Sequence, residues 1–278
     1  MENVSLSAWK SIATHQKEKR VEAEQTQRHL RAAVIQRARI IHQMKIVIER
    51  PLFKENPKVY MYNGDGTALF KNFMGEMDAI YSQTDQVLKQ AQFKISSSLT
   101  YTPSRTMRQG MEIFDSADAA IIPFEFKSTT RALNKLMLSD PDTSDFQATT
   151  NSLTMKNEVT FQLKADEVAK LRIYSAVQKY EEAGRVVFVL RSFTEGQGNL
   201  RGYNTEETGW FSVRPGDSTE DCKSAIIEVY TRFTPFSFGE ASDGNVDADR
   251  FADIVAKSGE KEVNELGQML EKLLLGEA

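Results

Sequence analysis

Cysteine and histidine are nearly missing from this chain. Cys222 is the only cysteine among 278 residues, so no disulfide can form within the chain, and we expect a reducing compartment. The histidines His15, His29 and His42 all precede residue 50. This distribution excludes a Ser-His-Asp or Cys-His catalytic site and a histidine-based zinc site within residues 52–278. A single cysteine cannot form a thiolate cluster around a metal either.

Long apolar runs are missing too. The run VVFVL at 186–190 is a typical maximum, far below the roughly 20 apolar residues that a membrane-spanning helix needs. The first residues lack the apolar stretch of a secretory signal. The hydrophobic share of 40% is still enough for a substantial core. We therefore expect a cytoplasmic or nuclear protein without a transmembrane segment.

Neither sign of charge dominates the chain. Its formal net charge is −4, which gives no reason to expect nucleic-acid binding by the chain as a whole. The charge is uneven, because residues 1–50 carry ten Lys or Arg and five Glu, which leaves −9 for residues 51–278. Such an asymmetry can mark a basic N-terminal arm.

The basic stretch at 9–51 predicts a long helix. It contains no glycine and stops at Pro51, which cannot continue a helix. Apolar residues recur at heptad spacing, most strongly from Val34 to Ile48. Polar residues such as Arg20 and Arg37 interrupt this apolar seam. We therefore assign residues 1–51 to a basic, coiled-coil-like helix, 52–66 to a linker and 67–278 to a globular domain.

This opening helix admits three interpretations. A DNA-reading basic region of the leucine-zipper type would carry an asparagine that reads base edges, and residues 9–51 have none, which argues against direct DNA binding. The second interpretation is a homodimer through residues 27–48. The third is a helix packed on its own domain, with its basic face in solvent. The sequence leaves the last two open.

The globular part begins with helical patterns. Residues 67–90 predict one amphipathic helix with Thr67 as its N-cap, and residues 128–138 a short helix capped by Ser128. Between them, 109–126 mixes strand and turn character.

Strand patterns follow from residue 157 onward. We expect strands at 157–163, 170–182, 185–193, 209–215 and 223–238, with a hairpin turn at Gly184 and a polar connection at 196–208. Short turns between successive strands indicate an antiparallel meander, because parallel strands would need intervening helices.

The chain closes with a long amphipathic helix, predicted at 247–275. Its apolar face follows 3-4 spacing and includes two polar residues, Ser258 and Glu262. Gly259 and Gly267 each cost about 1 kcal/mol relative to alanine inside a helix, and they let it bend or lie close to the sheet. The element order therefore predicts an α+β fold in which a curved antiparallel sheet grips this helix and leaves a cavity lined by apolar residues.

Several motifs in this order resemble one known family. They are WKSIATHQKEKR with HLRAAV after it, MDAIYSQTDQVL, GRVVFVLRSF, TGWFSVRP and IIEVYTRFTP, which together span nearly the whole chain. The sequence resembles the START-like (StAR-related lipid-transfer) helix-grip proteins, and more specifically the START-like proteins of oomycetes that form a mating-specific family. Some relatives carry a zipper-type DNA-binding segment upstream of the helix; here that segment is either absent or left out by a short gene model.

The resemblance implies a non-enzymatic module that binds a lipid or another hydrophobic small molecule. The site residues expected on the strands are Phe161, Ile173, Val177, Phe188, Leu190, Ile227 and Val229, and those on the final helix are Phe251, Ile254, Leu266 and Met269. Arg191 or Glu112 would supply a polar anchor. No cofactor is expected. No metal is expected either, since the acidic residues from Asp243 to Asp247 lack the glycine and glutamate of a calcium loop. The alternative is a coiled-coil or transcription-associated regulator with this domain as scaffold or sensor.

Overall fold

The computed structural model describes residues 66–108, 111–138, 147–148, 151–164, 167–216, 223–237 and 246–276, with seven residues between 16 and 27. The chain divides into two compact units, Met1–Lys58 with Arg108–Met111, and Val59–Met107 with Glu112–Ala278. The seven described residues between 16 and 27 are helical and exposed. The expected apolar seam, its dimer and all of the linker except Gly66 lie outside the described residues, so they remain predictions.

A nine-stranded sheet dominates the second unit, and five of its strands form the expected meander. These are β5 (Ser152–Lys164), β6 (Glu167–Glu182), β7 (Arg185–Gln197), β8 (Tyr203–Pro215) and β9 (Ala225–Ser237). Each pairs with the next in antiparallel register. The β6–β7 hairpin turns at Gly184, as predicted, and a short 3-10 helix (Gly198–Leu200) connects β7 to β8.

Four further strands extend this meander at its two edges. The long strand β3 (Met111–Ile122) pairs antiparallel with β9, and β1 (Ile95–Ser96) pairs parallel with β3. Strand β2 (Ser104–Arg108) also pairs with β3, and β4 (Gln147–Ala148) pairs with β5. The resulting order is β1-β3-β9-β8-β7-β6-β5-β4.

Two helices cover the outer face of this sheet, where one helix was predicted. They are α2 (Thr67–Tyr81) and α3 (Thr84–Gln90). The indole of Trp210 donates to the Ile80 carbonyl at 3.1 Å, the group that would accept from residue 84 in a continuous helix. The predicted stripe of α2 is confirmed, because Leu69, Phe73, Met77 and Ile80 are its buried residues.

The N-cap of α2 is a glycine, not the predicted threonine. Gly66 is the N-cap and has a φ of +83°, a left-handed conformation that favours glycine. A Cβ at this position would lie 2.9 Å from Cδ1 of Tyr174, so the close approach of Tyr174 also requires a residue without a side chain here. Thr67 is therefore the first helical residue rather than the cap.

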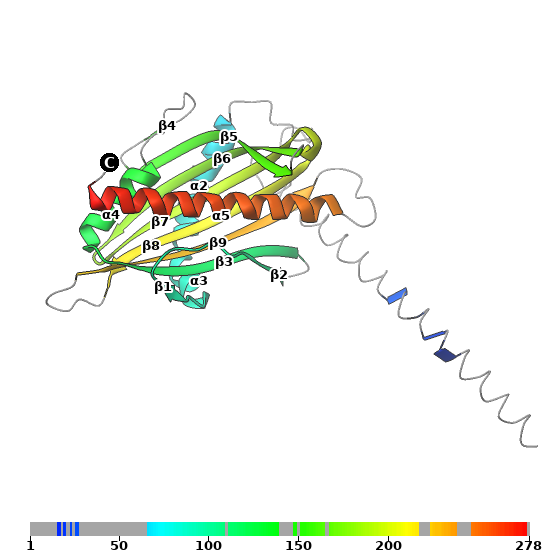
Figure 1. Ribbon diagram of the computed structural model, residues 1–278, viewed down its shortest axis with the longest axis horizontal. Helices are drawn as coiled ribbons and strands as arrows, with labels where there is room; N and C mark the ends of the chain where they lie inside the picture. Colours follow the sequence, from blue (N-terminus) through cyan, green and yellow to red (C-terminus); the bar gives the residue numbers. More distant parts are fainter. Residues whose placement is uncertain are drawn as a thin grey trace, which may run out of the picture. The chain divides into compact units, whose positions relative to one another are not determined.

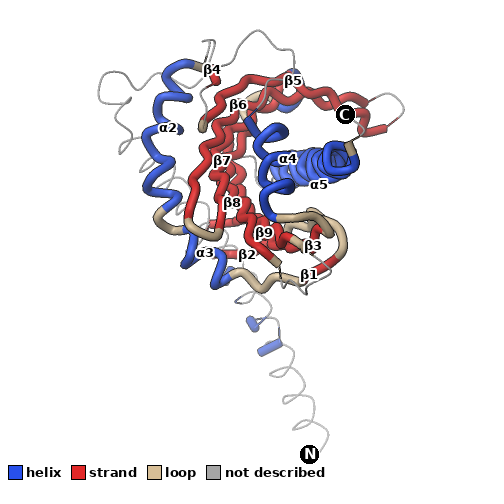
Figure 2. The backbone as a smooth tube through the Cα atoms, turned by 90° about the vertical axis from the view of Figure 1, so that its left-hand side faces the viewer, coloured by secondary structure: helices blue, strands red, loops and turns tan. Residues whose placement is uncertain are grey.

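Two other helices lie on the inner face, and the sheet curves around them (Figure 2). Helix α4 (Phe126–Leu138) packs beside α5 (Val246–Leu275), and α5 runs across the strands (Figure 1). Helix α4 begins two residues before the predicted cap Ser128, which is therefore an interior position. This arrangement of a sheet around a long C-terminal helix is the helix-grip α+β fold that the sequence predicts.

The order of the strands agrees with the prediction, whereas the residues at which several strands begin differ from it. Strand β8 begins at Tyr203, inside the stretch that was expected to be a polar connection. Strand β5 begins at Ser152 rather than 157, and β3 is continuous where strand and turn were expected to mix. None of the helices in the described part of the chain is both long and apolar enough to span a membrane.

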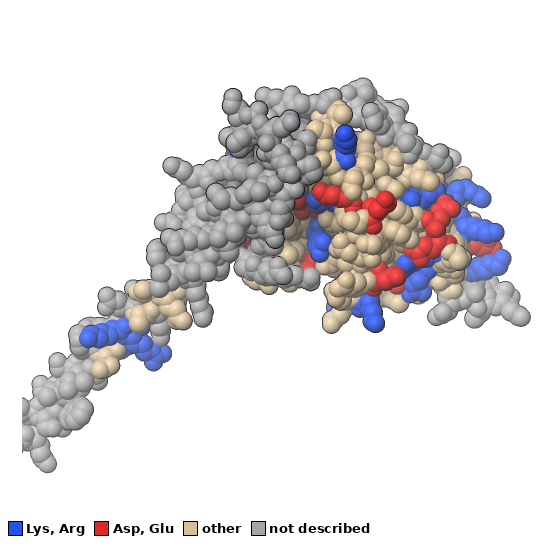
Figure 3. Space-filling view, turned by 180° about the vertical axis from the view of Figure 1, so that it is seen from behind, with Lys and Arg blue, Asp and Glu red and all other residues tan. Residues whose placement is uncertain are grey.

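The outer side of the molecule carries charges of both signs. Figure 3 shows this side, where lysine and arginine side chains alternate with aspartate and glutamate over the described surface. Arg191, for example, lies between Glu76 of α2 and Glu206 of β8. A uniformly basic surface, as expected for binding to the phosphates of nucleic acid, is not seen on the described part of this side.

Candidate functional site

The inner face of the sheet is the surface that the sheet and α5 enclose between them. Side chains alternate between the two faces of a strand, so the pairing register fixes which residues share this inner face. Phe188 pairs with Phe211, which in turn pairs with Val229, and these three lie in one cluster with α4 and the C-terminal half of α5. Every second residue along each strand belongs to the same face.

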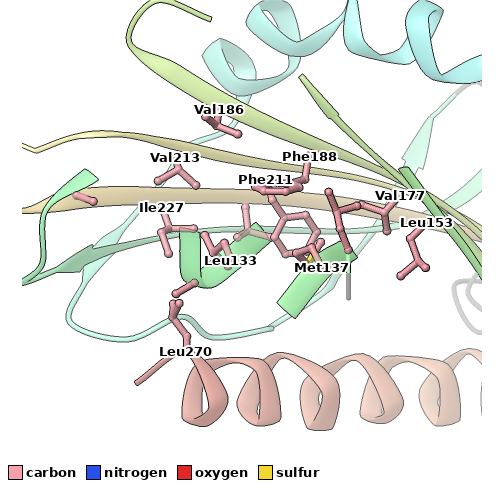
Figure 4. Close-up of a cluster of buried hydrophobic side chains, with 14 residues drawn as sticks. Leu133, Met137, Leu153, Val177, Val186, Phe188, Phe211, Val213, Ile227 and Leu270 are labelled. Carbon is pink, nitrogen blue, oxygen red and sulfur yellow. The ribbon is translucent and has the colours of Figure 1, made fainter. Parts of the chain in front are cut away.

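A first apolar cluster occupies the end of the inner face near α4. Leu133 and Met137 of α4 and Leu270 of α5 meet side chains of the central strands (Figure 4). The strand residues of this cluster are Leu153, Val177, Val186, Phe188, Phe211, Val213, Ala225, Ile227 and Val229. Burying such side chains contributes roughly 1.5–3 kcal/mol each relative to leaving them exposed. This end is a well-packed core.

A second apolar cluster occupies the opposite end of the inner face. Phe251, Ile254 and Val255 from the start of α5 pack there on the sheet. The buried strand residues of this cluster are Phe114, Ala169, Leu171 and Phe233, and Phe114 and Phe233 stack with ring centroids 4.8 Å apart. Phe161 and Ile173 pack against the cluster and are partly buried. The inner face thus has an apolar cluster at each end of α5.

Polar residues separate the two clusters on every element that crosses between them. On β6, Ser175 lies between Ile173 of the second cluster and Val177 of the first, and Ser192 of β7 and Glu207 of β8 continue the same row. We call the following set the polar belt: Ser116, Ser175, Ser192, Thr194, Thr205, Glu207 and Thr231 from the sheet, with Ser258 and Glu262 from α5. Its residues lie in the middle of the inner face, not at an edge.

The two carboxylates of the belt are held in unfavourable surroundings. Burial, and then the charge of Glu262, raise the pKa of Glu207 to about 7. Burial also raises the pKa of Glu262. Each accepts one long hydrogen bond, from Ser192 Oγ to Glu207 Oε2 at 3.3 Å and from Ser258 Oγ to Glu262 Oε1 at 3.4 Å. The belt therefore holds two weakly compensated acids close enough to repel each other.

Tyr101 closes the belt on the side of β3. It is buried, shares a hydrogen bond with Thr231, and its pKa is raised by burial and then by the charge of Glu207. Its ring lies against α5 at Gly259, where an added Cβ would be only 2.7 Å from Tyr101 Cε1. Gly259 therefore lets α5 lie close to this tyrosine, in line with the sequence-based expectation for a helix glycine.

The inner face is incompletely covered between the clusters. Leu190 lies on central strand β7, with β6 and β8 on either side, and yet it remains only partly buried. Its neighbour in register on β8 is Gly209, which contributes no side chain. Glu207 is also only half-buried, and Glu262 keeps an accessible side chain. Since these residues face α5, the accessible surface belongs to the space between sheet and helix.

All but two of the predicted site residues lie on this inner face. Phe161, Ile173, Val177, Phe188, Leu190, Ile227, Val229, Phe251, Ile254 and Leu266 belong to the two apolar clusters or pack against them. Met269 belongs to neither cluster and is 48% exposed, because Leu270 takes the inward position on that turn of α5.

The structure places Arg191 on the outer face of the sheet, contrary to its predicted role as a polar anchor in the site. Strand alternation directs Leu190 inward and Arg191 outward, where Arg191 donates to Glu76 of α2 at 2.9 Å and lies over the ring of Phe73. It therefore cannot be a polar anchor inside the site. The other suggested anchor, Glu112, is buried but pairs with Arg105 of β2 at the end of the sheet, away from the belt.

Sequence reasoning missed the residues that make the belt unusual. Glu207 was assigned to a polar connection and Tyr101 to no element. The available signal was the alternation from Tyr203 to Val213, in which Tyr203, Thr205, Glu207, Gly209, Phe211 and Val213 share one face. The inward residues are polar in the first half of the strand and apolar in the second, so the first half was interpreted as a polar loop. Among the described residues, no group of three His, Cys, Asp or Glu side chains could hold a metal ion.

Comparison with known proteins adds a limited likeness. No protein-family model and no curated protein sequence matches the chain, so membership of the oomycete family receives no support. Among solved structures, a conserved protein from Geobacillus kaustophilus is similar over 58% of this chain and 95% of its own, with 9% identity and a TM-score of 0.33. The protein Ara h 8.0201 is similar over 59% and 99%, with 10% identity and a TM-score of 0.29. A protein from Rhizobium leguminosarum is similar over 57% and 98%, with 14% identity and a TM-score of 0.26. At these scores the fold assignment rests on the sheet and helices described above.

Proposed function

We propose that this chain binds a hydrophobic or amphipathic small molecule between the inner face of the sheet and α5, and that it does so without catalysis. The observation that carries the proposal is the incomplete cover over Leu190 at the centre of the sheet. A core residue in a central strand is normally enclosed on all sides, because protein interiors pack as densely as organic crystals. An occupant would complete this packing.

The chemistry of the surrounding residues supports the same proposal. Ligand sites in proteins are mostly apolar and contain a few polar groups that fix orientation. Here two apolar clusters flank the polar belt, so an amphipathic molecule would find apolar contacts on both sides of a polar contact. Partly buried apolar side chains, Phe161, Ile173, Leu190 and Leu266, offer surface that such a molecule would remove from water.

Native mass spectrometry of the purified full-length protein, followed by denaturing extraction, tests this proposal. We expect a bound mass of lipid or metabolite size that is released on denaturation. The variant Gly209→Leu should abolish the bound mass, because the new side chain would point into the space beside Leu190. A Cβ at Gly209 would lie 3.3 Å from its nearest neighbour, Thr231 Cγ2, so this side chain must shift by a few tenths of an ångström. Circular dichroism of the variant, compared with that of the unmodified protein, shows whether the fold is kept.

Gly75→Leu is the matched control. Gly75 is an exposed residue of α2 on the other side of the sheet, and an added Cβ would meet nothing within 4 Å. This variant should keep the bound mass. If the protein carries no bound mass and also fails to bind decanoate, decylamine and 1-decanol in titrations, the binding proposal is wrong.

A further inference from the structure

We propose that the molecule held between the sheet and α5 carries a basic amine, whose positive charge is accepted by Glu207 and Glu262. This inference rests on the proposed function, since it names the class of molecule that would occupy the same space. It follows from the charges of the inner face, from an unpartnered hydroxyl beside Glu207, and from the position of both carboxylates in the polar belt.

The charges of the inner face are unbalanced at the belt. Lys179 pairs with Glu181 at 2.8 Å, and Lys261 with Glu265 at 3.6 Å, although the charge of Lys261 also acts on Glu262. Arg105 pairs with Glu112 and with Asp249 of α5. No ion pair joins Glu207 or Glu262 to any cation in the described ranges. A protein-enclosed carboxylate without a cation is costly, and an ammonium group would compensate it.

A buried hydroxyl beside Glu207 also lacks a hydrogen-bond partner among the described residues. Thr205 precedes Glu207 by two residues on the same face of β8, and it is 1% exposed. Within the described part of the chain, its Oγ1 has no hydrogen-bond partner. Leaving such a group unpaired costs about 1–3 kcal/mol. The hydroxyl can accept from a ligand N–H or donate to a ligand oxygen, so it calls for a polar group of either kind. The two carboxylates favour the amine, because the carboxylate of a fatty acid would add a third negative charge.

Two titratable groups interact with Glu207, namely Glu262 of α5 and Tyr101 from the segment before β2. The charges of Lys261 and Glu265 act on Glu262. Asp118 of β3 and Lys179 of β6 lie on the same face of the sheet, in register with residues of the first apolar cluster. Asp118 is buried and accepts the backbone N–H of Thr100. With the pKa of Glu207 near 7, the free protein holds this carboxyl partly protonated at neutral pH. Amine binding should therefore release a proton and strengthen as the pH rises from 6 to 8.

Titration calorimetry with three decyl probes tests the inference on the full-length protein. Decylamine, decanoate and 1-decanol share one chain and differ only in the polar group. At pH 8 we expect decylamine to bind about tenfold or more tightly than either other probe, the least that one charge-assisted contact in a partly enclosed site would give. Glu207→Gln and Glu262→Gln should each remove most of this advantage, which is measured as the ratio of the affinities for decylamine and 1-decanol.

Glu271→Gln supplies the matched control, because Glu271 is an exposed residue of α5. It should keep the full preference for the amine. If all three probes bind equally, or decanoate binds best, the inference is overturned while the proposed function stands. If none binds, the inference is overturned, and the proposed function is overturned with it when the purified protein also carries no bound mass. If Glu207→Gln fails to fold, Glu262→Gln and the proton release of the unmodified protein, measured in two buffers of different ionisation enthalpy, still decide the question.

Discussion

Replacing Glu207 with glutamine removes an ionisable group from the middle of the inner face and keeps the size of the side chain. In the native protein, the pKa of Glu207 is raised to about 7, mainly by burial and then by the charge of Glu262. In the unfolded chain the same carboxyl titrates near 4.3. Between these two values the native state holds a proton that the unfolded state has lost.

The sign and the size of the effect follow from this difference. Where the native state binds more protons than the unfolded state, stability falls as the pH rises. The stability of the unmodified protein should therefore fall between about pH 4.5 and pH 7 and then level off. The shift of about 2.5 pKa units corresponds to roughly 3 kcal/mol, which the accessible part of the side chain reduces to about 2 kcal/mol.

Urea unfolding at pH 5 and pH 8 measures this prediction. Glu207→Gln should match the unmodified protein at pH 5 and exceed its free energy of unfolding by about 2 kcal/mol at pH 8. Glu262, whose pKa burial also raises, leaves a smaller pH dependence in the variant. Glu271→Gln should show the same difference at both pH values. A constant difference between Glu207→Gln and the unmodified protein at the two pH values would refute an enclosed, weakly compensated Glu207.

Three further predictions use other positions. Gly259→Ala should lower the free energy of unfolding by about 1–2 kcal/mol, since the clash with Tyr101 outweighs the helix propensity of alanine. Gly267→Ala, where a Cβ meets nothing within 4 Å, should raise the free energy of unfolding by up to about 1 kcal/mol. Thermal unfolding measures both changes. Arg191→Met should destabilise by about 1–2 kcal/mol through loss of the contacts of Arg191 with Glu76, Glu206 and the ring of Phe73, with probe affinities unchanged in calorimetry. Sedimentation equilibrium should show a dimer if residues 27–48 form the predicted coiled coil; a monomer at every concentration would contradict that interpretation.

The elements that were predicted well are those whose sequence period matches a single environment. The stripe of α2, the 3-4 spacing of α5 and the strands around Gly184 each present one apolar face to one apolar cluster. In these elements local pattern and tertiary packing agree. Short turns between strands then fix the antiparallel order, because no crossover helix intervenes.

The elements that were predicted poorly lie where tertiary contacts decide. At the break between α2 and α3, the Ile80 carbonyl accepts from Trp210, a residue distant in sequence, as well as from the backbone of Gln83. The N-cap at Gly66 depends on the close approach of Tyr174. The direction of Arg191 was missed because its neighbours 186–190 are apolar on both faces of β7. A strand covered by helices on both sides shows no alternation from which a direction can be predicted.

The polar belt explains both the hidden start of β8 and the proposed site. A strand that follows the inner face across two apolar clusters must cross the belt, so its inward residues change from Tyr203 and Thr205 through Glu207 to Phe211 and Val213. Folding alone would favour apolar residues in the middle of this face, because a half-buried carboxylate next to a second carboxylate, and an unpaired buried hydroxyl, lower stability. Residues that oppose stability in an otherwise consistent fold are expected at functional sites. The unfavourable chemistry of Glu207 and Glu262 therefore argues that this space accommodates a molecule able to compensate them.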